Sequence, residues 1–315
     1  MSETILQVEH LTKKFPVAGG NFLTACDDIN FSVCKGEIVA IVGESGCGKS
    51  TLLNLIMNFL TPTSGKIIFH GKDTSQFTNE EKRQNYKNIQ MIFQDTSAAF
   101  NPKMKVKDVI CESLLNFGLI SKSEVEKKSV ELLEQVELPT DFMNRYPHNM
   151  SGGQRQRVAT AAALAINPEI ILCDEATSAL DVSVQDKIIK LFAKLRREKG
   201  TSYIFVTHDI ALAGKFAEKI CVMYLGNIVE EIDGDKFENA RHPYTNALLK
   251  SIFSIDAEKN QKIEILQGDI PSPSNIPKGC PFQNRCKYCE ELCRKKKPDF
   301  RKIGQNHFIA CHYSA

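Results

Sequence analysis

Gly43-Glu-Ser-Gly-Cys-Gly48-Lys49-Ser50 is the stretch that decides the fold. It fits the pattern Gly-x4-Gly-Lys-Ser/Thr, in which glycines let successive backbone N–H groups turn toward phosphate oxygens. A compact apolar run over residues 37–42 precedes it, and leucines and isoleucines at helical spacing follow over residues 49–59. A strand, a glycine-rich turn and a helix in this order predict a phosphate-binding βα unit, the alternative being an ordinary glycine-rich turn.

The polar residues of this loop have chemistry that suits a nucleotide. Lys49 would reach the β and γ phosphates, and the Ser50 hydroxyl is placed to ligate Mg2+. The following helix presents its N-terminus to the same anion, and its dipole favours negative charge there. The loop therefore predicts a site for a magnesium–nucleotide complex.

A second apolar strand, Ile170-Ile-Leu-Cys-Asp174-Glu175, ends in two acids. The carboxyl end of a parallel strand would place them at the sheet edge that carries the phosphate loop. Asp174 suits a place just outside the direct ligands of Mg2+, and Glu175 is positioned to polarise an attacking water. Taken alone the pair could be a solvated strand end, so its meaning depends on the phosphate loop.

Ser151-Gly-Gly-Gln154-Arg-Gln-Arg157 precedes an alanine-rich helix, where it would offer N–H donors and a hydroxyl to an anion. With these residues the sequence resembles the ABC transporter ATPases, whose signature is Leu-Ser-Gly-Gly-Gln. Met150 replaces the leucine and keeps an apolar side chain. The resemblance covers residues 3–230.

Further positions match the same family in its order. Gln94 matches the glutamine that senses Mg2+ and the transmembrane partner, and Ser178-Ala-Leu-Asp181 matches the loop that crosses the dimer interface. His208 resembles the histidine that holds the γ-phosphate, and Phe15 the aromatic that stacks on adenine. Singly, Gln94 could be a plain loop residue, His208 a capping or core histidine, and Phe15 a core aromatic.

The resemblance implies that ATP lies between the phosphate loop of one subunit and the Ser-Gly-Gly of another. It implies three catalytic residues, Lys49, Glu175 and His208, and three Mg2+ residues, Ser50, Gln94 and Asp174. The residues expected to bind ATP in one subunit are Phe15, Gly43, Glu44, Ser45, Gly46, Cys47, Gly48, Lys49, Ser50, Thr51 and Gln94. Those expected to bind it from the opposite subunit are Ser151, Gly152, Gly153, Gln154 and Asp181.

Local stretches narrow the family. Phe93-Gln-Asp95, Phe100-Asn-Pro102, Leu180-Asp-Val-Ser-Val-Gln185 and His242-Pro-Tyr-Thr245 resemble the ATPases of oligopeptide and dipeptide importers, with nickel and metal-chelate importers as the alternative. Ile270-Pro-Ser-Pro273 resembles the second of two paired ATPases. The resemblance implies a heterodimer with a homologous ATPase, two transmembrane permeases and an extracytoplasmic binding protein. A non-transport ABC ATPase is disfavoured because such proteins usually carry two cassettes or a long coiled coil.

Five of the eleven cysteines crowd into the last part of the chain. The spacing Cys280-x5-Cys286-x6-Cys293-x17-Cys311 matches the cysteine pattern of many peptide-importer ATPases, and some relatives hold a [4Fe-4S] cluster with it. Four thiolates suit either that cluster or tetrahedral Zn2+. A reduced tail without metal is the remaining alternative, and Cys289 is an extra thiol that could compete as a ligand.

The composition is typical of a folded protein. The 40 basic and 38 acidic residues leave a net charge of only +2, so the chain has no strong electrostatic field and we expect no nucleic-acid partner. MSETILQVEH lacks the pattern of a secretory leader, and no apolar run reaches the ~18 residues of a membrane span. We expect a place at the cytoplasmic face of the membrane through the permeases.

The expected architecture is α/β. It comprises a P-loop NTPase core with a mostly parallel sheet, an antiparallel β subdomain and a helical insertion. The expected boundaries are an ATPase domain over residues 1–235, with its helical subdomain at about 95–150, and a cysteine-rich extension over residues 236–315.

Overall fold

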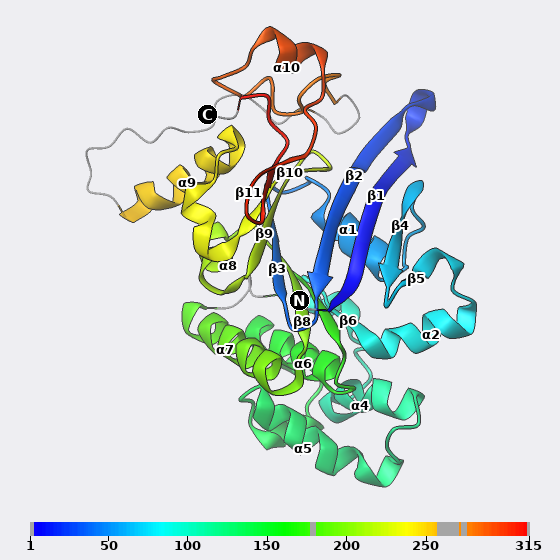
Figure 1. Ribbon diagram of the computed structural model, residues 1–315. Coiled ribbons are helices and arrows are strands. Elements are labelled where there is room, and N and C mark those ends of the chain that lie inside the picture. Colours follow the sequence, from blue (N-terminus) through cyan, green and yellow to red (C-terminus); the bar gives the residue numbers. More distant parts are fainter. Residues whose placement is uncertain (1–2, 177–180, 257–270, 272–275, 314–315) are drawn as a thin grey trace. The chain divides into compact units, whose positions relative to one another are not determined.

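The computed structural model describes residues 3–176, 181–256, 271 and 276–313, and Figure 1 traces their helices and strands. The chain divides into two compact units. The first comprises Met1–Cys34, Ile38–Gln76 and Thr207–Ala315, and the second comprises Lys35–Glu37 and Phe77–Val206. The segments of the first unit are far apart in the sequence, so its core is assembled from both ends of the chain.

An antiparallel sheet occupies the N-terminal part of the first unit, with strand order β2-β1-β4-β5. Figure 1 shows β1 and β2 as two long strands side by side. Alternate residues of β1, such as Leu6 and Val8, are buried as the period of a strand requires. The strands are β1 (Thr4–Pro16), β2 (Phe22–Cys34), β4 (Ser64–Phe69) and β5 (Lys72–Asp73).

A second set of strands in the first unit has the order β11-β12-β10-β9-β3. β3 pairs with β9 in parallel, and the remaining pairs are antiparallel. Every residue of β3 is buried, which explains its unbroken apolar sequence. The strands are β3 (Ile38–Val42), β9 (Lys219–Tyr224), β10 (Asn227–Asp233), β11 (Arg301–Gly304) and β12 (His307–Ile309).

The helical elements of the first unit connect and cover these strands. The α-helices are α1 (Lys49–Ile56), α8 (Ile210–Phe216), α9 (Pro243–Asp256) and α10 (Glu291–Lys295). The 3-10 turns are η1 (Ala18–Gly20), η2 (Thr74–Gln76) and η6 (Gly234–Asn239). The amphipathic α1 buries its leucines and isoleucines directly after the phosphate loop.

The second unit contains the parallel strand order β8-β7-β6 and a group of helices. Its strands are β6 (Ile89–Ile92), β7 (Ile170–Asp174) and β8 (Ser202–Thr207), the last ending one residue beyond the unit. Its α-helices are α2 (Asn79–Asn88), α3 (Thr96–Ala99), α4 (Val106–Asn116), α5 (Val125–Gln135), α6 (Gly152–Leu164) and α7 (Val182–Lys199). Its 3-10 turns are η3 (Lys122–Glu124), η4 (Thr140–Asn144) and η5 (Pro147–Asn149).

Helices α4, α5 and α6 share one hydrophobic core, in which Ile110, Leu133 and Val158 are fully buried. Of these helices, α4 and α5 lie within the range predicted for the helical insertion, and α6 follows it. The predicted α/β class, with parallel strands, an antiparallel sheet and inserted helices, is confirmed. The domain boundary near residue 235 stays a prediction, and β12 pairs with β10 across it.

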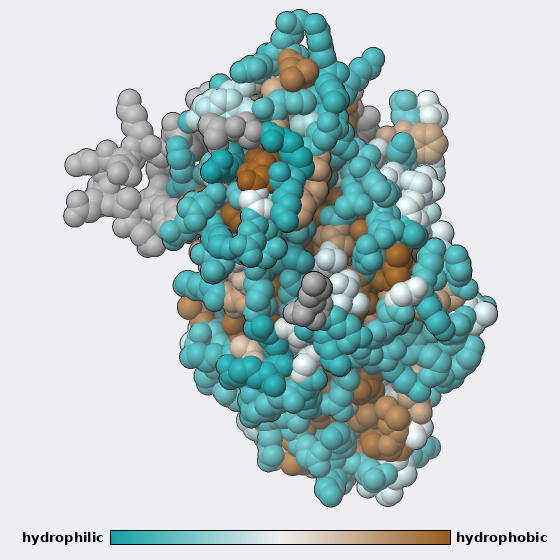
Figure 2. Space-filling view, viewed as in Figure 1, coloured by the Kyte–Doolittle hydropathy of each residue, from teal (hydrophilic) through white to brown (hydrophobic). Residues whose placement is uncertain are grey.

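Hydrophilic side chains cover most of the face seen in Figure 2, with hydrophobic groups in separate patches between them. In the described part of the chain, no helix has both the length and the apolar composition of a membrane span.

Candidate functional site

The phosphate loop lies between β3 and α1, as the sequence predicts. Lys49 is only 5% exposed, and its Nζ donates to the carbonyl oxygens of Gly43 at 2.8 Å and Glu44 at 2.9 Å. Cys47 Sγ lies 3.7 Å from the same ammonium, and burial raises the pKa of this thiol. The lysine is therefore held inside the curve of the loop.

Close backbone approach explains the glycine at the end of the loop. Gly48 has a φ of +107°, and a Cβ there would lie 2.0 Å from the carbonyl oxygen of Ala25. Gly48 also occupies the N-cap of α1, and no side chain caps this helix. The first-turn N–H groups of a helix have no partners within it, so they can bind phosphate oxygens.

Two other residues predicted to act at the ATP site, Phe15 and His208, also lie in the first unit. Phe15 is half-buried on β1, and Lys13 Nζ lies 5.0 Å from its ring centroid. His208 is exposed and directly follows β8. Asp209 then caps α8 by accepting a hydrogen bond from the Leu212 N–H at 2.9 Å. His208 is therefore held between the end of β8 and the start of α8.

The second unit brings a predicted catalytic residue, Glu175, together with Gln94, which is predicted to bind Mg2+. Gln94 Nε2 donates to Glu175 Oε2 at 2.6 Å. Asp174 is the last residue of β7 and is only 7% exposed. Glu175, the next residue, is partly exposed. Glu175 has a φ of 47°, which is uncommon for a residue with a side chain. Its N–H donates to the Val206 carbonyl at 3.0 Å, which secures this backbone turn.

Ser151 and Gln154 form a capping box at the start of α6. The Gln154 N–H donates to Ser151 Oγ at 3.3 Å, and the Ser151 N–H donates to Gln154 Oε1 at 3.0 Å. The box fixes the helix N-terminus whose amides the signature was predicted to present, and Ser151 itself is exposed. Asp181 is the N-cap of α7 and accepts from the Val184 N–H at 2.9 Å.

The predicted site residues are thus divided between the units. The first unit holds Phe15, residues 43–51, His208 and the cysteine tail. The second holds Gln94, residues 151–154, Asp174, Glu175 and Asp181. Positions 178–180 of the predicted interface loop, and most of Ile270-Pro-Ser-Pro273, lie outside the described residues.

The four predicted cysteine ligands influence one another. Burial raises the pKa of Cys280 to about 12, a hydrogen bond from the Phe282 backbone opposes this, and Cys311, Cys293 and Cys286 raise the pKa further. The Cys280 N–H donates to the Cys293 carbonyl at 2.7 Å. Within the described ranges, however, no three His, Cys, Asp or Glu side chains are arranged as a metal site.

Sequence reasoning missed two residues that hold the phosphate loop. The Glu44 N–H donates to Tyr244 Oη at 3.0 Å, and Arg285 donates to both carboxylate oxygens of Glu44 at 2.7 and 3.0 Å. Tyr244 lies in the His242-Pro-Tyr-Thr245 stretch and Arg285 directly precedes Cys286. Both stretches stood out only as family patterns, because contacts over 200 positions leave no local signal.

Comparison with known proteins decides the family. The model of the ABC transporter family matches residues 26–178, and that of the oligopeptide/dipeptide transporter C-terminal region matches residues 229–293. The chain is 41% identical over 321 residues to the oligopeptide transport ATP-binding protein AppF of Bacillus subtilis, covering 98% of this chain and 97% of the relative. The chain belongs to the family of oligopeptide ABC transporter ATP-binding proteins. The OppF protein of Haemophilus influenzae, at 40% identity and the same coverage, agrees with this assignment.

Solved structures of ABC cassettes share the fold. The dimeric structure of the MJ0796 cassette has a TM-score of 0.68 and 34% identity, and it covers 73% of this chain and 98% of its own. The same values hold for that cassette's dimeric post-hydrolysis state with ADP and Pi. As a member of the ABC transporter family, this chain is an ATPase. Both solved cassettes leave about a quarter of this chain without a match, since each covers 73% of it.

Proposed function

We propose that this ATPase couples the binding and hydrolysis of MgATP to the uptake of oligopeptides or dipeptides. The observation that carries the proposal is a complete phosphate loop, with Lys49 buried inside it, in a chain that matches oligopeptide transport ATP-binding proteins over almost its whole length. The match to the oligopeptide/dipeptide transporter C-terminal region supports the choice of cargo.

Each of these groups has a proposed role in the chemistry. Lys49 and the N–H groups at the start of α1 would bind the phosphates, and Ser50 and Asp174 would hold Mg2+ with Gln94. Glu175, in contact with Gln94, would orient and deprotonate the attacking water. His208 would contact the γ-phosphate and stabilise the charge that develops on it.

Completion of the site needs a second ATPase. The capped N-terminus of α6 presents Ser151 at an exposed position, where it can bind the phosphates held by another subunit. The dimeric cassette of similar fold supports this arrangement. ATP would then join the two subunits, and hydrolysis would release them, which is a ligand-driven cycle of closure and opening.

The proposed assembly pairs this chain with a homologous ATPase as a heterodimer. Two permeases would form the channel and hold both ATPases at the cytoplasmic face of the membrane. An extracytoplasmic binding protein would deliver the peptide. The names of the relatives, which are ATP-binding proteins of peptide transport, support this division of labour.

We also propose that Cys280, Cys286, Cys293 and Cys311 hold a [4Fe-4S] cluster, with Zn2+ as the alternative. The donor set suits this cluster chemically because all four residues are cysteines without a disulfide bond. Backbone hydrogen bonds from Phe282 and Tyr288 reach the thiols of Cys280 and Cys286 and would stabilise thiolates. A bound cluster would supply a cross-link between the segments that carry its ligands.

Reconstitution tests the transport proposal. The chain is assembled with its permeases and companion ATPase in vesicles, and ATP-dependent uptake of labelled oligopeptides is compared with uptake of nickel. Peptide uptake that stops in the Glu175→Gln variant supports the proposal. Nickel uptake without peptide uptake, or peptide uptake that persists in Glu175→Gln vesicles, would refute it.

A further inference from the structure

The cysteine-rich extension makes a direct ionic contact with the phosphate loop. Arg285 and Glu44 form a two-pronged ion pair in which the Arg285 side chain is 5% exposed and the Glu44 side chain 23% exposed. The two residues are separated by 241 positions, and both belong to the first unit. A paired arginine and carboxylate of this geometry form strong hydrogen bonds with a fixed orientation.

Glu44 is held at three of its groups. Its carboxylate binds Arg285, its N–H donates to Tyr244 Oη at 3.0 Å, and its carbonyl accepts from Lys49 Nζ at 2.9 Å. The first two partners come from the chain beyond residue 235. The third is the lysine that binds phosphate. Glu44 therefore links the extension to Lys49 through a single residue.

Arg285 is itself fixed by the segment that carries it. Phe282, three positions earlier, is buried against Tyr224 and Tyr244, with ring centroids 5.3 and 5.4 Å apart. The Arg285 N–H donates to the Phe282 carbonyl at 3.0 Å, and its guanidinium lies 5.9 Å from the Tyr224 ring centroid. These contacts hold the Arg285 side chain in one position.

We propose that Arg285 is a positioning residue for the ATPase: it fixes Glu44, and through it the phosphate loop and Lys49, in the conformation that binds nucleotide. The inference rests on the proposed role of this loop in MgATP binding. It assigns the extension a part in nucleotide affinity, which the motif of the loop alone does not reveal.

The effect should fall on binding rather than on the chemical step. Loss of Arg285 leaves the Glu44 carboxylate without its cation, so the loop can rearrange and the Lys49 ammonium loses a fixed acceptor. Glu175 and Gln94 belong to the other unit and keep their own hydrogen bond. KM for ATP should therefore rise while kcat of the assembled transporter changes little.

A double-mutant cycle measures this directly. Kd of a fluorescent ATP analogue is determined for the full chain and its Arg285→Gln, Glu44→Gln and doubly substituted forms. We expect each single substitution to raise Kd about tenfold, the loss that accompanies one charge-assisted hydrogen bond. The double substitution should raise Kd no further, because the two side chains act as one unit. Arg285→Lys should restore part of the affinity.

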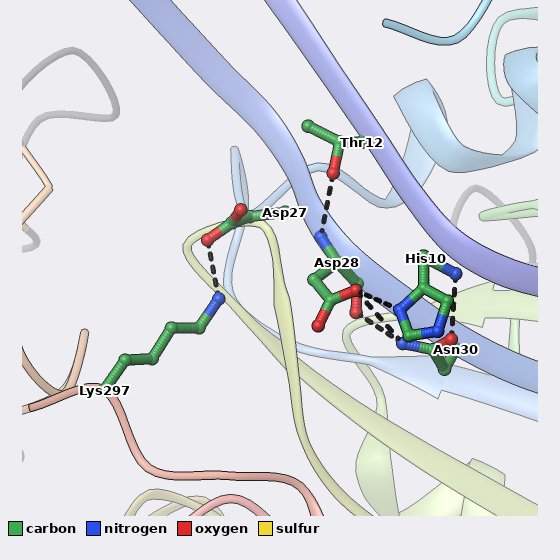
Figure 3. Close-up of polar contacts among 6 residues, drawn as sticks. All are labelled: His10, Thr12, Asp27, Asp28, Asn30 and Lys297. Atoms are coloured by element: carbon green, nitrogen blue, oxygen red, sulfur yellow. Dashed lines mark hydrogen bonds and ion pairs between the residues drawn. The ribbon is translucent and has the colours of Figure 1, made fainter. Parts of the chain in front are cut away.

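A second ion pair of the extension supplies the matched control. Lys297 Nζ lies 2.6 Å from Asp27 Oδ2 on β2, away from the hydrogen-bonded group of His10, Asp28 and Asn30 (Figure 3). Lys297→Gln removes a contact of the extension without touching the phosphate loop, so Kd should stay at the wild-type value. Equal increases in Kd for Lys297→Gln and Arg285→Gln would show general loosening and overturn the proposal.

Two further outcomes are decisive. Wild-type affinity in soluble Arg285→Gln or Glu44→Gln would overturn the positioning role. If Arg285→Gln does not fold, Glu44→Gln breaks the same pair from the loop side and its Kd decides. A wild-type chain that binds no ATP analogue would instead refute the proposed function, so the two failures can be told apart.

Discussion

Gln94 and Glu175 lie in hydrogen-bond contact, with 2.6 Å between Nε2 and Oε2. The two residues follow neighbouring parallel strands, β6 and β7, whose carboxyl ends meet at one edge of the sheet. The amide donor orients the carboxylate, and the backbone of Glu175 has a φ of 47°, which is uncommon for a residue with a side chain. The carboxylate that we propose as the general base is thus already held by a hydrogen bond.

Glu175→Gln should retain ATP binding and lose hydrolysis. The amide has the shape of the acid but cannot accept a proton, so we expect turnover to fall by about 10²–10⁴-fold. Phosphate release by the assembled ATPase pair is the measurement. Asp186→Asn on α7, which removes an exposed pair with Lys190, is the control and should leave turnover unchanged. Normal hydrolysis by Glu175→Gln would remove this residue as the base.

Cys293→Ser should abolish bound iron, acid-labile sulfide and brown colour in anaerobically purified protein, since the cluster needs all four thiolates. Cys289→Ser is the matched control, because that cysteine lies in the same segment but outside the predicted set. The Cys289→Ser protein should keep its brown colour. A colourless wild-type protein that contains zinc would favour the alternative metal, and equal loss in both variants would contradict the ligand assignment.

Gly48→Ala should destabilise the chain and weaken nucleotide binding. The new Cβ would meet the Ala25 carbonyl at 2.0 Å in a backbone conformation with φ of +107°. We expect the free energy of unfolding to fall by roughly 3 kcal/mol, combining overpacking with backbone strain. Gly118→Ala also has positive φ, at +65°, but meets no atom within 4 Å. Similar losses in the two variants, measured by chemical denaturation, would argue against the steric explanation.

His242 should make the fold sensitive to acid. Burial lowers its pKa from 6.5 to about 4, and its Nδ1 accepts the Tyr244 N–H at 3.1 Å, so the folded chain keeps it neutral. Between these pH values the unfolded chain binds more protons, and the free energy of unfolding therefore falls as pH drops from 6.5 toward 4, by up to roughly 3 kcal/mol.

The His242→Asn variant tests this pH dependence. An asparagine oxygen can accept the same N–H but does not titrate in this range, so Tm should depend less on pH than in the wild type. Thermal unfolding at several pH values between 4 and 7 is the measurement. Identical slopes in the two proteins would show that other groups carry the acid sensitivity.

Local patterns were sufficient to predict the central elements. β3, α1 and β7 are marked by short apolar runs or helical spacing next to the chemical motifs, and each lies where the sequence placed it. The strands β6 and β10 were not predicted, because polar residues interrupt their apolar pattern and pairing with neighbouring strands stabilises them. The short apolar strand β9 was not predicted either. The weak periodicity after residue 234 likewise concealed α9.

In the candidate site too, local motifs could be predicted from the sequence and contacts between distant segments could not. Motif spacing predicts roles for Lys49, Glu175 and Ser151, since each chemical role requires a residue type at a fixed offset. The pair Arg285–Glu44 and the buried Glu230, which accepts from His307 at 2.8 Å, join segments far apart in the sequence. Such contacts depend on how strands of the two chain ends assemble, which one sequence does not reveal.

The central claim is that this loop binds ATP through Lys49, and nucleotide titration of Lys49→Ala tests it most directly. The wild-type chain should bind MgATP, measured by calorimetry in the presence of its companion ATPase made unable to bind nucleotide. Lys49→Ala should lose at least about 100-fold in affinity while retaining its Tm, since a charge-assisted contact to phosphate disappears. Equal MgATP affinity in both proteins would contradict the account.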